Sequence, residues 1–224
     1  MPRARKAVLE SPPSGDDFES NGVEARADGK QKKALITIPE IRRNRLRLHL
    51  IGDSGLICHK FSEKAQKAMA DKQGKKGKQA KPARKPEDEA KATLYPMGKS
   101  KYGFPGIAFK SAVVTACSAT EGMTKILARQ TIHVIEDLVE IKGPYAKKPP
   151  TRCDPARIVN SWDLRYRCWF PEWNVWITID YNANVISPEQ IATLFNLAGY
   201  GVGVGDWRVE RNGQMGRFHV GTAS

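Results

Sequence analysis

Two distant stretches of this chain alternate between apolar and polar residues with the period of a β-strand. In residues 46–50 (LRLHL), three leucines alternate with Arg47 and His49, and in residues 174–182 (NVWITIDYN) aliphatic and tyrosine side chains alternate with Trp, Thr and Asp. Successive side chains of a strand point to opposite faces of its sheet. Each stretch therefore predicts a strand with one buried face.

Helical signals accompany these strands. Residues 102–119 contain a Pro-Gly step followed by apolar residues at helical spacing, which predicts a strand that leads into a helix. Residues 187–190 (SPEQ) match an N-cap, a proline at the first helical position and a capping-box partner. The apolar stripe that follows predicts a helix that ends at Gly199 in a left-handed conformation.

Shorter segments complete an expected α+β fold. Residues 129–143 hold two short strand patterns, and residues 143–155 (GPYAKKPPTRCDP) are rich in proline and predict a loop with basic tips. After the last helix, a glycine-rich run, a polar turn and the strand-like sequence RFHV predict a hairpin that closes a sheet.

Positive charge is concentrated in one part of the chain. The 224 residues carry a formal net charge of +13, and residues 34–101 contribute +10 of it. A lysine run beside a folded core neutralises phosphates and releases their counterions. We therefore predict nucleic-acid contacts by seven lysines of this run, namely Lys60, Lys64, Lys67, Lys72, Lys75, Lys76 and Lys78. A solvated loop that serves solubility is the alternative.

The composition also predicts how the chain is organised. Residues 1–33 combine prolines, serines and mixed charge with little periodic apolar content, so we expect a disordered N-terminal arm. Residues 34–224 are expected to form the α+β domain, with a basic insertion at about 60–91. No apolar run reaches the length of a membrane span and the N-terminus lacks an apolar signal core, so we expect a cytoplasmic protein without membrane contact.

Cysteine and glycine spacing argue against a metal or cofactor site. The four cysteines, at positions 58, 117, 153 and 168, match no zinc-ligand spacing, so we expect no metal. Gly201, Gly203 and Gly205 form a GxGxG run, but a dinucleotide-binding glycine run follows a strand and opens a helix, whereas these glycines follow a helix. We therefore expect no nucleotide cofactor.

The glycine run is instead a candidate for close backbone approach. Glycines without a Cβ allow either a neighbouring element or a nucleic-acid backbone to lie against the main chain. Arg208, Arg211 and Arg217 lie around the same turn, where guanidinium groups could pair with phosphates. We count these arginines and glycines as predicted nucleic-acid contacts, with structural packing of the glycines as the alternative.

Three segments, taken in order, resemble the RAMP superfamily of CRISPR proteins, which includes crRNA-binding backbone subunits and crRNA-processing endoribonucleases. LRLHLIGDSGLICHK is similar to the family's first strand and turn, FPGIAFKSAVVTAC to its lysine-bearing helix start, and GVGVGDWRVERNGQMGRFHV to its terminal glycine-rich loop and strand. The resemblance implies a ferredoxin-like, RNA-recognition-type antiparallel sheet with helices on one face. It also implies that Lys110 and the loop from Gly201 to Gly205 face a nucleic-acid backbone. The tail resembles short prophage proteins as well, which implies a phage or prophage gene.

The sequence offers fewer candidates for catalysis and for base stacking than for contact with phosphates. His59 is the best candidate for a catalytic base, because it follows the first strand directly and the adjacent Lys60 ammonium favours a neutral imidazole. Tyr166 and Arg167 lie in SWDLRYRCWFPEWNVW, where basic and aromatic residues interleave as they do in base-stacking surfaces. The alternative for this aromatic cluster is a core or a subunit interface.

The sequence thus favours a non-catalytic protein that binds RNA or single-stranded DNA, assembled side by side as a homo-oligomer or filament. The first alternative is a metal-independent endoribonuclease that uses His59. The second is a phage single-strand annealing or recombination factor. An acidic protein partner is a further alternative for the basic charge.

Overall fold

The computed structural model describes residues 38, 40–61, 66–67, 69–71, 84–158 and 161–221. The chain divides into two units, Met1–Pro39 and Glu40–Ser224. Of the first unit only Ile38 is described, and it is exposed. The predicted arm at 1–33 lies outside the described residues, as do five of the predicted lysine contacts, Lys64, Lys72, Lys75, Lys76 and Lys78.

The second unit is built around a four-stranded antiparallel sheet with the strand order β10-β1-β9-β5. Its strands are β1 (Arg43–Gly52), β5 (Ile132–Val134), β9 (Asn174–Asn182) and β10 (Phe218–Val220). Helix α3 (Gly106–Ala116) lies between β1 and β5 in sequence, and α5 (Pro188–Gly201) lies between β9 and β10. This β-α-β-β-α-β order is the ferredoxin-like arrangement. The predicted α+β fold class is therefore confirmed.

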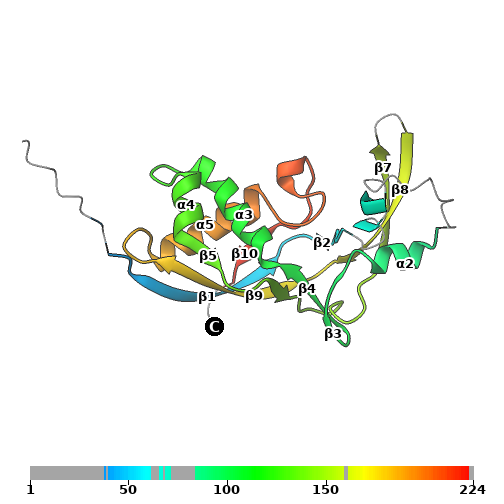
Figure 1. The fold of residues 1–224 in the computed structure, drawn as a ribbon, viewed down its shortest axis with the longest axis horizontal. Coiled ribbons are helices and arrows are strands. Elements are labelled where there is room, and N and C mark those ends of the chain that lie inside the picture. The colour runs from blue at the N-terminus through cyan, green and yellow to red at the C-terminus, as the bar shows by residue number, and fades with distance from the viewer. Residues whose placement is uncertain are drawn as a thin grey trace, which may run out of the picture. The chain divides into compact units, whose positions relative to one another are not determined.

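The helices cover one face of this sheet. In Figure 1, α3, α5 and the short helix α4 (Lys125–Thr131) lie on the same side of β1 and β9. The sheet side chains on this side are apolar and buried, which confirms the predicted inward faces of both alternating stretches; those with no exposed surface include Leu50, Val175, Ile177 and Ile179. Phe109 of α3 and Phe195 of α5 are fully buried as well. On the opposite face, no helix of the described residues covers the two central strands (Figure 1).

The capped helix α5 begins as predicted. The Ser187 side chain accepts a hydrogen bond from the Gln190 amide, and the Gln190 side chain accepts one from the Ser187 amide, so the capping box is complete. The predicted end at Gly199 is wrong, because α5 continues to Gly201. Gly199 serves close packing instead: a Cβ there would lie 1.8 Å from the Phe218 carbonyl oxygen.

The insertions between the core strands form two further three-stranded sheets. One has the order β2-β8-β7, from β2 (Leu56–Ile57), β7 (Thr151–Ile158) and β8 (Ser161–Phe170), and α2 (Pro86–Lys91) packs on β8. The other has the order β3-β4-β6, from β3 (Tyr95–Gly98), β4 (Lys101–Pro105) and β6 (Leu138–Glu140). Short 3-10 turns span η1 (Cys117–Ala119) and η2 (Val209–Arg211).

Two local predictions are corrected by these elements. The segment at 143–155 is not entirely a loop, because β7 begins at Thr151 and pairs along its length with β8. The predicted final hairpin is wrong as well, because β10 pairs with β1 at the edge of the core sheet. The polar segment before β10 contains η2, which ends at Arg211 and is followed by Asn212 with φ 59°. In the part of the chain that the structure describes, no helix is both long and apolar enough to cross a bilayer.

Candidate nucleic-acid interface

The helix-free face of the core sheet carries a row of basic side chains. Since the leucines of β1 face the helices, the alternate residues Arg43, Arg45, Arg47 and His49 point to the other side. The register places them opposite Asn182, Asp180, Thr178 and Trp176 of β9. The three arginines are exposed and His49 is half-buried. We call this surface, formed by the named residues of β1 and β9, the open sheet face.

An aromatic stack lies at one end of the open sheet face. The His49 imidazole stacks on the Trp176 indole with ring centroids 4.5 Å apart and planes inclined by 10°. The Arg47 guanidinium lies 5.0 Å from the centre of the same indole, within cation–π range. His49 Nε2 is 3.1 Å from Asn174 Oδ1, which fixes the imidazole. Trp176 nevertheless keeps 40% of its surface exposed.

The charge of the open sheet face is predominantly positive. Among the residues of β1 and β9 on this face, Asp180 is the single carboxylate. Arg43 donates a hydrogen bond to Asp180, which lowers the pKa of that carboxyl and raises the pKa of Arg43. Arg43 is therefore largely neutralised by its partner. Arg45 and Arg47 supply the positive charge that remains for an anionic ligand.

The predicted glycine contacts lie in the loop after α5, where packing accounts for two of them. Gly203 has φ +73° and Gly205 has φ +82°, both in the left-handed region that favours glycine. A Cβ on Gly205 would lie 2.7 Å from the Ile57 carbonyl oxygen of β2, and one on Gly203 would lie 3.1 Å from the Met215 carbonyl oxygen. A Cβ on Gly201 would meet nothing within 4 Å. Of the three glycines, Gly201 alone has open space beside it.

The end of the glycine loop joins a network of charged side chains that brings together two predicted site residues. Asp206 accepts hydrogen bonds from Arg167 and from His59, whose Nδ1 is 3.0 Å from Asp206 Oδ2. Arg167, only 5% exposed, also donates to Asp154 over 2.9 Å. The hydrogen bond from His59, together with the charge of Arg167, lowers the pKa of Asp206 to about 2 although burial opposes the shift.

Trp207 covers this network. Its indole centre lies 5.3 Å from the Arg167 guanidinium and 5.5 Å from that of Arg152, which in turn donates to Asp154. Trp207 has φ +56°, a left-handed conformation that is uncommon for a bulky residue. The terminal nitrogens of Arg167 are engaged by two carboxylates, and its buried Nε has no hydrogen-bond partner among the described residues. This geometry gives Arg167 an internal role, and its contact with nucleic acid stays a prediction.

The remaining arginines of the predicted site are dispersed around the glycine loop. Arg208 forms an ion pair with Glu210 over 2.7 Å and donates to the Gly205 carbonyl. Arg211 is exposed on η2. Arg217 is half-buried, and its Nε has no hydrogen-bond partner among the described residues.

The three predicted lysine contacts that the structure describes, Lys60, Lys67 and Lys110, differ in their surroundings. Lys110, the fifth residue of α3, donates from Nζ to the Arg129 carbonyl and to His133 Nδ1, each over 3.1 Å. Burial lowers the pKa of Lys110. Lys60 follows β2 and is half-buried, whereas Lys67 is exposed. The structure therefore places Lys110 in a network with α4 and β5, apart from the His59–Asp206 cluster.

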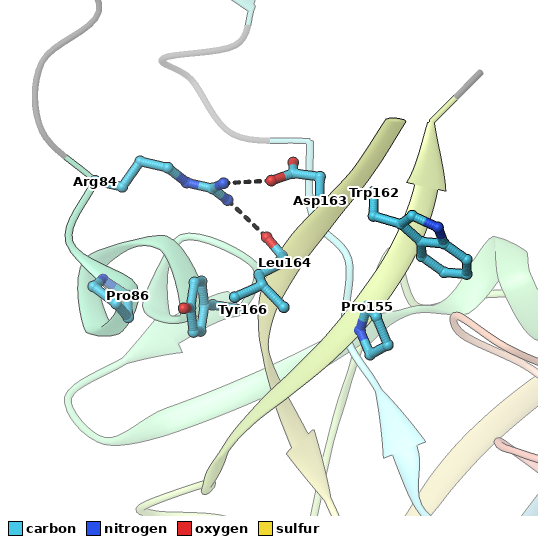
Figure 2. Close-up of a pocket in the computed structure, with 7 residues that line it drawn as sticks. All are labelled: Arg84, Pro86, Pro155, Trp162, Asp163, Leu164 and Tyr166. Carbon is cyan, nitrogen blue, oxygen red and sulfur yellow. Dashed lines mark hydrogen bonds and ion pairs between the residues drawn. The ribbon is translucent and has the colours of Figure 1, made fainter. Parts of the chain in front are cut away.

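Tyr166 lines a recess between α2 and the β7–β8 pair, with a volume of about 410 Å³. Figure 2 shows Pro86 and Arg84 beside Tyr166, with Leu164, Pro155 and Trp162 completing the lining. Arg84 donates to both oxygens of Glu89, to Asp163 and to the Leu164 carbonyl. These acceptors occupy most of the guanidinium donors, so the recess is poorly suited to phosphate. Trp162 is 73% exposed at its rim.

Sequence reasoning missed the open sheet face. In the sequence, Arg47 and His49 indicate the polar face of a strand, and Trp176 ends an aromatic cluster whose alternative role is a core or a subunit interface. The signal that indicates this face in the sequence is the recurrence of arginine at positions 43, 45 and 47, because alternate residues lie on one side of a strand. Within the described residues, no group of three or more His, Cys, Asp or Glu side chains is arranged to hold a metal ion.

Comparison with known proteins adds little to this geometry. No known family model matches the chain, and no curated protein matches it. Among solved structures, the chain is similar to Cmr6 from Pyrococcus furiosus, known from its crystal structure, at 10% sequence identity and a TM-score of 0.40. The similarity covers 81% of this chain and 100% of that one. A likeness of this strength decides neither family nor function, and membership of the RAMP superfamily stays a prediction.

Proposed function

We propose that this protein binds single-stranded nucleic acid, RNA or DNA, along the open sheet face. The observation that carries the proposal is the combination of two charged arginines, Arg45 and Arg47, with the partly exposed His49–Trp176 stack on one face of a ferredoxin-like sheet. Alternate side chains on β1 are about 6.6–6.8 Å apart, comparable with the spacing of phosphates in an extended strand. Guanidinium groups pair with such phosphates through several N–H donors.

The aromatic stack favours a single strand over a duplex. Bases are accessible for stacking on side chains only where the strand is unpaired, and four-stranded sheets with exposed aromatic residues bind RNA in this way. The overall charge of +13 supports the same polymer class. Under this proposal the protein acts as a binder, and side-by-side assembly along the strand is the accompanying hypothesis.

Two exposed tryptophans offer a matched test. Trp176→Ala should weaken the binding of a fluorescein-labelled single-stranded RNA about 5- to 150-fold, since stacking contributes about 1–3 kcal/mol per base. Trp162→Ala, a more exposed tryptophan on β8, should leave the affinity unchanged. Anisotropy titrations with RNA, single-stranded DNA and duplex DNA measure both effects and rank the polymers. Equal losses in the two variants, or a preference for duplex, would refute the proposal.

A second candidate function is metal-independent RNA cleavage at His59. The observation that favours it is the Asp206–His59 pair, because an Asp that fixes Nδ1 orients an imidazole for acid–base chemistry at Nε2. His59 has 47% of its side chain exposed, and its Nε2 makes no hydrogen bond with any described residue. In this function, His59 would remove the proton of a ribose 2′-hydroxyl, whose oxygen would attack the adjacent phosphate. The attack would form a 2′,3′-cyclic phosphate and break the bond to the 5′-oxygen of the next nucleotide, which would take a proton from water.

His219 provides the control for this function. It is 48% exposed and its Nδ1 lies 2.6 Å from Asp53, so it is held in the same manner as His59. Labelled RNA incubated with the protein in EDTA should be cleaved by the wild type and by His219→Ala, but not by His59→Ala, if the protein is a ribonuclease. Intact RNA in all three reactions leaves binding as the function.

A further inference from the structure

A recess of about 350 Å³ lies at the end of the core sheet where β1 begins. Arg43 belongs both to this recess and to the open sheet face, so a strand that follows β1 from Trp176 past Arg45 reaches it. Ile41 forms an exposed apolar part of its lining, and His133 of β5 contributes a ring. The distance along β1 from His49 to Arg43 is about 20 Å, enough for several nucleotides.

The polar groups of the recess present both a hydrogen-bond acceptor and donors. Asp180 supplies the carboxylate and is held by Arg43. Asn182 Oδ1 accepts a hydrogen bond from the Asn184 amide over 3.1 Å. The oxygen of the Asn182 side chain is therefore occupied, and its NH₂ group is the part left to donate. An acceptor and a donor on adjacent outward positions of one strand match the edge of a nucleobase.

His133 offers its ring face and not its nitrogens. Lys110 Nζ donates to His133 Nδ1 over 3.1 Å, so Nε2 carries the proton that is donated to the Gln130 carbonyl, also over 3.1 Å. Both nitrogens are thus engaged. Stacking on the exposed imidazole is the interaction that remains for a ligand.

We propose that this recess receives one nucleobase of the bound strand. The inference rests on the proposed function and adds a base-recognition site to it. A phosphate is disfavoured because Asp180 would repel it and already neutralises Arg43. A nucleobase is a neutral, planar group with both donors and acceptors on its edge. Its edge fits the Asp180 acceptor and the Asn182 donor, and its ring faces fit the His133 imidazole and the Ile41 side chain. The volume is also adequate, since ligand pockets begin at about 300 Å³.

Nucleosides separate base recognition from phosphate binding. NMR titration of the isotope-labelled full chain with adenosine, cytidine or uridine should shift the resonances of residues 131–133 and 180–182, whereas ribose 5-phosphate should not. Asp180→Asn keeps the shape of the side chain but removes its charge. That variant should weaken the nucleoside effect about tenfold or more, because a charged acceptor is lost, and it should permit ribose 5-phosphate to bind.

The results distinguish failure of the base site from failure of the proposed function. Wild-type shifts with ribose 5-phosphate at the recess, or nucleoside shifts confined to Trp176, would overturn the base site. A parallel titration with single-stranded RNA tests the proposed function by itself. RNA binding without nucleoside shifts at the recess removes the base site alone, and nucleoside shifts without RNA binding remove the proposed function.

Discussion

Replacing Gly203 by alanine should destabilise the fold without a specific effect on binding. Gly203 has φ +73°, and a left-handed conformation costs an L-residue about 1–2 kcal/mol. A Cβ would also lie 3.1 Å from the Met215 carbonyl oxygen and 3.2 Å from that of Gly216, so the loop must shift at a further cost of about 1–3 kcal/mol. The sum of about 2–5 kcal/mol corresponds to a fall in Tm of roughly 4–20 °C in a domain of this size.

Gly201 is the matched control for Gly203. It ends α5 with no described atom within 4 Å of the position a Cβ would take, so Gly201→Ala should be neutral or stabilise by up to about 1 kcal/mol. Circular dichroism melts and RNA titrations at 10 °C, where both variants stay folded, separate stability from binding. The packing argument fails if Gly203→Ala melts within about 2 °C of the wild type and yet loses affinity. That result would restore the glycine loop as a contact with the nucleic-acid backbone.

Two further predictions concern the charged network beneath Trp207. Arg167→Ala removes one of the two arginines that pair with the buried carboxylate of Asp154 and leaves Arg152 as its partner. The variant should lower the free energy of unfolding by about 1–3 kcal/mol in urea unfolding; no measurable loss would contradict a contribution of the buried Arg167–Asp154 pair to stability. The pKa of Asp206 is lowered from 3.8 to about 2, so its stabilisation is present above the unfolded value and is lost as the pH falls. The difference in the free energy of unfolding between the wild type and Asp206→Asn should therefore shrink, by at most about 2 kcal/mol, as the pH falls from about 5 to about 2. A difference that stays constant over this range would show that Asp206 does not titrate in this way.

Local periodicity predicted the core of this fold because the relevant signals lie within single elements. The alternation in 174–182 and the capping box at Ser187 are decided by residues within a few positions of one another, and both elements form as expected. The predictions that α5 ends at Gly199 and that a hairpin closes the sheet were wrong because both features depend on residues that are distant in the sequence. Position 199 needs a glycine because the Phe218 carbonyl, nineteen positions away, leaves no space for a Cβ. No local rule distinguishes a glycine needed for such packing from one that caps a helix.

The candidate site was less predictable because it depends on strand pairing. Arg47, His49 and Trp176 become one surface only when β1 pairs with β9, more than a hundred residues later, in the register His49↔Trp176. A shift of one residue would have placed the tryptophan on the helix side. The pairing of Asp206 with both His59 and Arg167 has the same origin, since these three residues come from separate parts of the chain.

The salt dependence of strand binding tests the open sheet face most directly. Each phosphate contact on a single strand contributes about 0.7 to the slope of log affinity against log salt concentration. Arg45→Ala/Arg47→Ala should therefore reduce the magnitude of this slope by about 1.4, whereas Lys125→Ala/Arg129→Ala, which removes two exposed cations from α4 in the helix layer, should leave it unchanged. An unaltered slope in the first variant, or an equal reduction in the second, would contradict binding along this face.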